Sequence, residues 1–157
     1  MTRVMAMCAA ALLAVACNTT YHGLSPLSPK VEGPPHASWP VVDSLQPTLR
    51  WSPAAESSVT YDLIIHEGVK AESFWRGTER AVGREAYYRE GLTASEHRVE
   101  QPLKPDTEYY WSVRTRTGDR VSEWSTYSYR REFILARQWG DNIPYRFRTP
   151  PAVEAGS

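Results

Sequence analysis

The sequence has little cysteine: Cys8 and Cys17 are the only two among 157 residues. The chain after them therefore has no disulfide framework and no thiolate zinc site. Lysine plus arginine equals aspartate plus glutamate, at 18 each, so no overall charge attracts nucleic acid. The longest apolar run, from Val4 to Cys17, is shorter than the roughly 20 residues that a membrane-spanning helix needs.

Catalytic and metal-binding motifs are also missing. The four histidines show no HExxH or HxH spacing, no serine lies in GxSxG or SxxK, and the nine glycines form no phosphate-binding loop. Glu67 and Glu72 could pair as glycosidase carboxylates, but carboxylates in an expected loop are usually solvated. We therefore predict a protein that is not an enzyme and that holds no metal or cofactor.

The first residues have the pattern of a secretory signal, because Arg3 is followed by the apolar run. The small residues 14–16 before Cys17 resemble a bacterial lipobox, although the leucine of that pattern lies one position early, at Leu13. The resemblance implies a signal peptide over residues 1–16 and a lipid on Cys17 that anchors the protein to a membrane of the bacterial cell envelope. The alternatives are a signal with an incidental cysteine, or a buried helix.

The residues after Cys17 indicate which membrane holds the protein, and they also indicate a linker. Asn18 replaces the aspartate that retains some lipoproteins at the inner membrane, so the resemblance favours the outer membrane. Residues 17–37 are small, polar and rich in proline, which breaks helices and removes donors from β-ladders. We predict a semi-extended tether over 17–37, a domain over 38–150 and a short tail over 151–157.

From about residue 40, apolar and polar residues alternate in short runs separated by turn signals, which is typical of β-strands. The alternation predicts that Asp62, Tyr110 and Arg146 point outward, opposite apolar neighbours that point inward. Several such strands indicate an antiparallel β-sandwich. The runs lie at 47–53, 59–68, 97–103, 108–119 and 144–150.

The run Leu103-x-Pro105-x-Thr107-x-Tyr109-x-Trp111-x-Val113 resembles the E–F corner and F strand of fibronectin type III domains. Trp51 resembles the core tryptophan of strand B, residues 61–65 resemble strand C, and Val99 resembles part of strand E. The resemblance implies an all-β, antiparallel Greek-key β-sandwich with long loop insertions. It also implies that the Tyr109 hydroxyl bonds to the backbone a few residues upstream. The core residues that it implies are Trp51, Tyr61, Leu103, Tyr109 and Trp111.

A second resemblance concerns residues 121–125, Val-Ser-Glu-Trp-Ser. They are similar to half of the Trp-Ser-x-Trp-Ser box of cytokine receptors, in which tryptophans interleave with arginines. The resemblance implies that Trp124 stacks on Arg114 or Arg116. This is a structural device and implies no cytokine.

Two segments, residues 69–96 and 126–144, exceed the connections of a minimal domain, and we predict long loops there. Loops on a rigid scaffold often bind partners, and the second segment combines arginines with aromatics. The alternative is that both loops only cover sheet edges. The predicted partner-binding residues are Tyr127, Tyr129, Arg130, Arg131, Arg137 and Trp139.

Two classes of function fit this sequence. The first is a module that binds another envelope protein or helps to assemble an envelope complex. The second is a reader of carbohydrate or peptidoglycan, indicated by aromatics such as Trp75, Tyr87 and Tyr88 in the expected loops. A structural spacer is a third possibility. We predict the first class, with no nucleic-acid partner.

Overall fold

The computed structural model describes residues 17–31, 38–73, 77–133 and 136–152. Within these ranges the chain is all β, with strands β1 to β11 and no helix. No helix in the described part of the chain is therefore long and apolar enough to cross a membrane.

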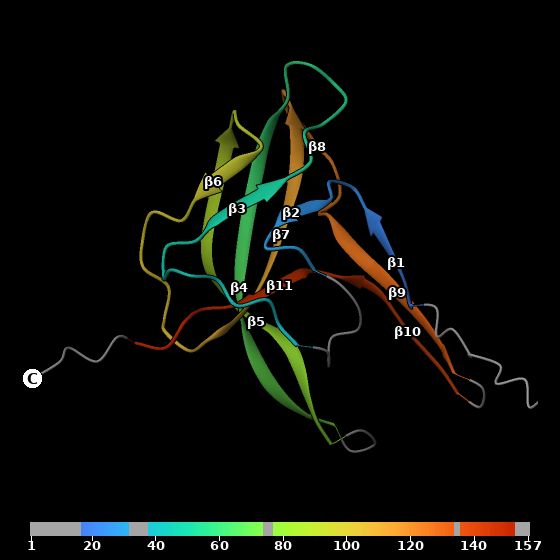
Figure 1. The fold of residues 1–157 in the computed structure, drawn as a ribbon. Coiled ribbons are helices and arrows are strands. Elements are labelled where there is room, and N and C mark those ends of the chain that lie inside the picture. The colour runs from blue at the N-terminus through green and yellow to red at the C-terminus, as the bar shows by residue number, and fades with distance from the viewer. Residues whose placement is uncertain (1–16, 32–37, 74–76, 134–135, 153–157) are drawn as a thin grey trace, which may run out of the picture.

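The strands form three sheets, and every pair of strands is antiparallel (Figure 1). The largest sheet has the order β11-β7-β4-β5, with β8 paired to β7; its strands are β4 (Thr60–Ser73), β5 (Gly77–Leu92), β7 (Glu108–Thr117), β8 (Arg120–Val121) and β11 (Tyr145–Arg148). The second sheet is β2 (Pro26–Ser28), β3 (Thr48–Trp51) and β6 (Glu96–Arg98). The third is β1 (Cys17–His22), β9 (Thr126–Phe133) and β10 (Ala136–Ile143).

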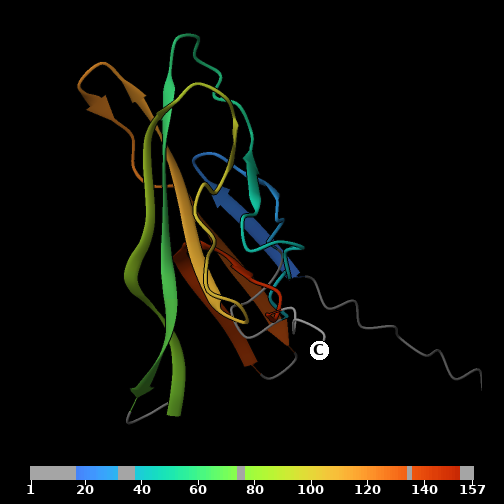
Figure 2. The ribbon, with the colours of Figure 1, turned by 90° about the vertical axis from the view of Figure 1, so that its left-hand side faces the viewer.

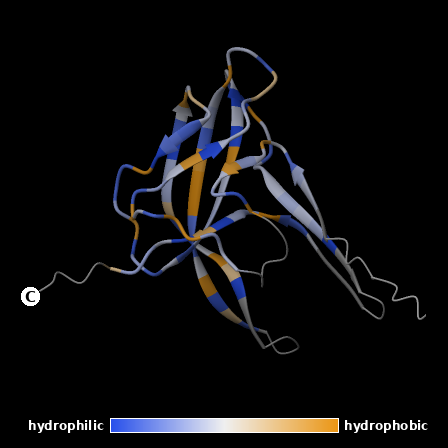
Figure 3. Cartoon of the chain, viewed as in Figure 1, coloured by the Kyte–Doolittle hydropathy of each residue, from blue (hydrophilic) through white to orange (hydrophobic). Residues whose placement is uncertain are grey.

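The sheets are arranged in layers. Seen from the side, the large sheet forms one layer, and β1 and β3 lie on one side of it (Figure 2). Hydrophobic and hydrophilic residues alternate along the strands (Figure 3), as expected where one face of a sheet is packed. This all-β, antiparallel arrangement is compatible with a β-sandwich.

Aromatic pairs dominate the core between the layers. Trp51 packs edge-on against Tyr61 at 5.5 Å between ring centroids, and Trp111 packs against Tyr145 at 5.0 Å. Such pairs contribute about 0.5–1.5 kcal/mol each beyond the burial of their apolar area. The five residues that the sequence predicts for the core, Trp51, Tyr61, Leu103, Tyr109 and Trp111, are all buried.

The prediction that Asp62, Tyr110 and Arg146 face solvent is wrong, because all three are buried. Trp39 covers this side of the large sheet: its ring lies 5.1 Å from that of Tyr110, and the Arg146 guanidinium lies 5.3 Å from the Trp39 centroid. Asp62 is instead enclosed by Arg114 and Arg116, which donate to it at 2.9 Å and 2.8 Å. The alternation rule assumes that one face of a sheet meets water, and it fails where side chains cover that face.

The predicted tether over 17–37 is wrong for residues 17–31, because residues 17–22 and 26–28 form the strands β1 and β2. Residues 32–37 lie outside the described ranges. β1 pairs with β9 along its whole length, and β2 pairs with β3. The Tyr21 hydroxyl donates to the carbonyl oxygen of Val31 at 2.6 Å, and Val31 is buried. Pro26 fits because β2 is an edge strand, where a residue without an N–H group is tolerated.

The two predicted loops are also wrong, since both segments are mostly strand. Residues 69–73 complete β4 and residues 77–92 form β5, while residues 126–133 and 136–143 form β9 and β10. Charged and polar residues occupy both faces of these strands, so they lack the apolar alternation that marks a half-buried strand.

The Tyr109 hydroxyl makes the backbone contact that the sequence predicts: the Lys104 amide donates to it at 3.0 Å. Tyr127 is also buried, but its hydroxyl has no hydrogen-bond partner among the described residues. Tyr109→Phe should therefore lower the free energy of unfolding by about 1–2 kcal/mol, because it leaves a backbone N–H unsatisfied. Tyr127→Phe should be neutral or stabilising. Chemical denaturation measures both, and equal losses in the two variants would contradict this assignment.

Candidate functional site

The structure divides the predicted partner-binding residues into buried and exposed positions. Tyr127 is fully buried and stacks on Tyr145 at 6.4 Å, and Tyr129 is 9% exposed. Burial raises the pKa of Tyr127 to about 12. These two tyrosines belong to the core, so their prediction as contact residues is wrong. Arg130 is exposed.

The remaining predicted residues lie on the hairpin of β9 and β10, where the structure describes their backbone and not their side chains. Arg131 pairs with Cys17 on one side and with Gln138 on the other. Trp139 lies opposite Arg130. The register therefore brings the predicted arginine positions to the end of the sheet where β1 begins.

A second exposed feature, which the sequence analysis missed, is an arm made from the distal halves of β4 and β5. β7 pairs with β4 only from Thr60 to Glu67, whereas β4 continues to Ser73 paired with β5 alone. We call residues 68–73 and 77–82 the arm; it extends beyond the other strands in both views (Figures 1 and 2). A two-stranded ribbon has no third strand or opposing layer to bury its apolar residues.

The arm exposes apolar side chains. Val69 is 42% exposed and Val82 is 45% exposed, and they lie in adjacent rungs of the β4–β5 ladder. The arm is close-packed at its root, where a Cβ atom on Gly83 would lie 2.6 Å from Val69 Cγ1 and 2.8 Å from the Glu67 carbonyl oxygen. Only glycine fits at that crossing without displacing backbone. Because neighbouring rungs alternate sides, the two valines lie on opposite faces of the ribbon, among charged residues. A ribbon with open strand edges on a fixed root can bind a partner by strand addition.

Ion pairs fix the root of the arm to the body. The Glu67 carboxylate accepts from Lys104 Nζ at 2.6 Å and from Arg84 Nε at 3.1 Å. These hydrogen bonds, that from Lys104 first, lower the pKa of Glu67. Arg80 forms an ion pair with Glu108 of β7. The direction of the arm is therefore set by contacts to two different segments of the body.

A buried carboxylate organises the middle of the large sheet. Asp62 accepts from Arg114 Nε at 2.9 Å and from Arg116 Nη2 at 2.8 Å. Desolvation by burial alone would raise the pKa of Asp62, but the hydrogen bonds from Arg116 and Arg114 outweigh it and lower the pKa. Trp124 stacks on Arg114 at 4.4 Å, which confirms the predicted contact. Arg116 also pairs with Glu90 at 3.4 Å, so two arginines face two carboxylates and the cluster supports the fold.

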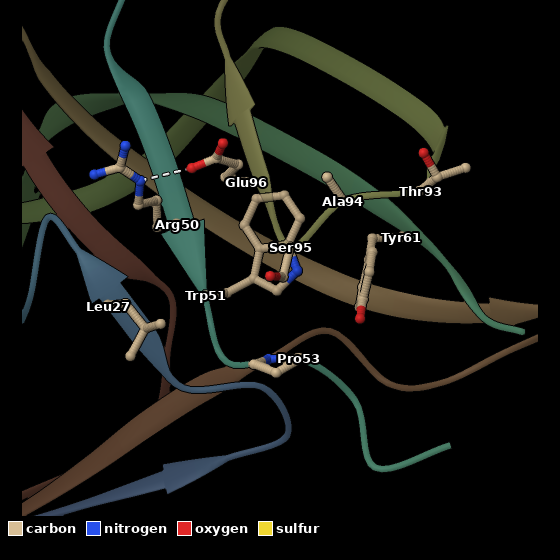
Figure 4. Close-up of a pocket in the computed structure, with 9 residues that line it drawn as sticks. All are labelled: Leu27, Arg50, Trp51, Pro53, Tyr61, Thr93, Ala94, Ser95 and Glu96. Carbon is tan, nitrogen blue, oxygen red and sulfur yellow. Dashed lines mark hydrogen bonds and ion pairs between the residues drawn. The ribbon is translucent and has the colours of Figure 1, made fainter. Parts of the chain in front are cut away.

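A shallow hollow of about 480 Å³ opens beside Trp51 (Figure 4). The Arg50–Glu96 ion pair, 2.7 Å long, lies on its rim, and the Tyr61 hydroxyl accepts from the Ala54 amide at 3.1 Å. The charged groups on its rim and the Tyr61 hydroxyl are therefore already paired. Its lining consists of Leu27, Arg50, Trp51, Pro53, Tyr61, Thr93, Ala94, Ser95 and Glu96.

Among the described residues, no three side chains of histidine, cysteine, aspartate or glutamate gather as metal ligands would. Comparison with known proteins gives no significant match to any protein-family model, curated protein or solved structure. The function must therefore be inferred from the geometry of the described residues.

Proposed function

We propose that this protein is a non-catalytic lipoprotein of the bacterial cell envelope whose β-sandwich binds another envelope protein. In this proposal residues 1–16 are a signal peptide, and a lipid on Cys17 anchors the protein, in the outer membrane rather than the inner one. The sandwich is a Greek-key domain of the fibronectin type III kind. The Lys104–Tyr109 hydrogen bond and the stacking of Trp124 on Arg114 support that assignment.

The observation that carries protein binding is the arm. It presents Val69 and Val82 on a ribbon whose strands lack further pairing partners in the described part of the chain. A partner strand could pair with the edge of β4 that is open beyond Glu67, and it would cover the exposed valine on the face that it packs against. The hairpin of β9 and β10 offers fewer partner-binding side chains than the sequence predicts, because Tyr127 and Tyr129 are buried.

The alternative is a carbohydrate or peptidoglycan reader, which needs exposed, coplanar aromatic rings beside carboxylates or amides. Tyr88, 38% exposed, is the one aromatic among the large exposed apolar residues whose side-chain burial the structure describes. Its neighbour Glu90 already accepts from Tyr88 and Arg116. The open strand edge of the arm therefore favours a protein partner.

Photocrosslinking in intact cells tests this proposal. A photoreactive amino acid at Val69 or Val82 should give an adduct with one discrete protein, identified by mass spectrometry. Ser57 and Asp119 are exposed and lie outside the arm, so the same probe there should give no such adduct. Equal adducts at all four positions, or none at Val69 and Val82, would show that the arm does not bind a partner.

A further inference from the structure

The proposed lipid on Cys17 determines which end of the β1–β9–β10 sheet lies next to the membrane. The inference that follows rests on this proposed function. β1 begins at Cys17, and Cys17 pairs with Arg131. Paired Cα atoms in an antiparallel ladder are about 5 Å apart. A lipid on Cys17 would therefore leave the protein directly beside the β9 backbone, with no linker between the membrane and the sheet.

The hairpin of β9 and β10 extends past this point. β9 continues from Arg131 to Phe133, two residues beyond the rung of Cys17. At a rise of about 3.3 Å per residue, this places the end of β9 about 7 Å further along the strand direction. If the acyl chains of Cys17 lie in the bilayer, the ends of β9 and β10 lie at the level of the lipid headgroups.

The residue types at this end match that environment. Arginines stand at positions 130, 131 and 137, against a single acidic residue, Glu132, between positions 130 and 139. The Arg130 side chain is exposed, and Trp139 lies opposite Arg130 in the ladder. Basic residues next to an anchor attract anionic lipids, and tryptophan is enriched at the membrane–water interface.

We propose that this end of the sheet docks on anionic phospholipid headgroups, so that the module lies against the bilayer in one orientation. Arg131 lies in the Cys17 rung, and Arg130 and Arg137 lie in the rungs on either side of it. The three positions therefore fall close to the membrane surface, where screening by salt is weak over about 8 Å. Each arginine should strengthen docking about fivefold. The loop between β3 and β4, residues 52–59, lies at the opposite end and would face away from the membrane (Figures 1 and 2).

Fluorescence quenching by lipids that carry a headgroup nitroxide tests this orientation. The purified acylated protein would be reconstituted into vesicles containing phosphatidylglycerol, with a fluorophore on Gln138→Cys or on Ser57→Cys. The acylated chain has no other free thiol, because Cys8 lies in the proposed signal peptide. Position 138 lies in the rung of Cys17 and Ser57 lies in the opposite loop, so the first label should be quenched severalfold more than the second.

The arginines are tested by the ratio of the two quenching values. Arg130→Ala/Arg131→Ala/Arg137→Ala, or vesicles of phosphatidylcholine alone, should lose most of the difference, because the module then samples many orientations. Arg50→Ala/Arg98→Ala/Arg120→Ala removes the same charge from exposed positions elsewhere and should keep it. A quenching ratio near one in the unmodified chain would overturn the proposal. So would a ratio that changes neither when the three arginines are replaced nor when the anionic lipid is omitted. The mass of the N-terminal peptide separately reports acylation, so an unacylated Cys17 would identify a failure of the proposed function instead.

Discussion

Asp62→Asn should lower the free energy of unfolding by about 3 kcal/mol. Asp62 is fully buried and its two carboxylate oxygens accept hydrogen bonds from Arg114 and Arg116. Asparagine keeps the shape but removes the charge, so two guanidinium groups lose their common partner. These arginines are partly exposed, which allows water to recover part of the loss.

The effect of Asp62 should depend on pH with a defined sign. Its pKa is lower in the folded protein than the ordinary value of 3.8, so the folded state favours the ionised form. This contribution is complete above the unfolded pKa, and it is lost as the pH falls through the folded pKa. The difference in stability between the native chain and Asp62→Asn should therefore be constant from neutral pH to about pH 5 and shrink below the ordinary pKa.

Glu96→Gln is the matched control for this prediction. Glu96 pairs with Arg50 at 2.7 Å, but both side chains are more than half exposed. An exposed ion pair contributes about 0–1 kcal/mol, so this substitution should have a small effect. Urea denaturation at neutral pH compares the two variants. If Asp62→Asn is no more destabilising than Glu96→Gln, the burial of Asp62 does not strengthen its ion pairs with Arg114 and Arg116.

The second large effect should come from Cys17→Ser, which should abolish acylation and release the protein from the membrane fraction. The thiol sulfur of Cys17 forms the thioether to the proposed diacylglyceryl group, and serine has no sulfur to form that bond. Metabolic labelling with a tagged fatty acid, followed by fractionation, measures both losses. Cys8→Ser changes the other cysteine and should retain label and membrane association. Labelling that persists in Cys17→Ser would contradict the assignment.

The inward-facing half of the fold could be predicted from the sequence, because large apolar residues at every second position must be buried. Leu49 and Trp51 of β3, and Tyr145 and Phe147 of β11, are buried as the alternation indicates. The outward-facing half could not be predicted in the same way. Whether Tyr110 and Arg146 meet water depends on Trp39, which lies far away in the sequence and covers them.

The strands of the N-terminal segment also depend on residues that are distant in the sequence. Its composition, rich in proline and small polar residues, indicates a linker, but composition does not reveal that β9 and β3 offer free edges to Cys17–His22 and Pro26–Ser28. Pairing with an edge satisfies the backbone without requiring a hydrophobic pattern in the added strand. The sequence therefore contains no strong local signal for β1 or β2.

The candidate site was predicted only in part. Aromatics beside arginines indicated the hairpin of β9 and β10, but the same residue types suit a core, and Tyr127 and Tyr129 are used there. The arm around Val69 and Val82 was missed because its charges occupy both faces. That pattern is itself a signal of a ribbon that water contacts on both sides.

The central claim is that the acylated first residue of the mature protein is also the first residue of β1. Its most direct test is mass spectrometry of the N-terminal peptide of the protein purified from bacterial membranes. We predict a peptide that begins at Cys17 and carries diacylglyceryl on the thiol. A peptide that begins at another residue, or a Cys17 that remains a free thiol, would contradict the account.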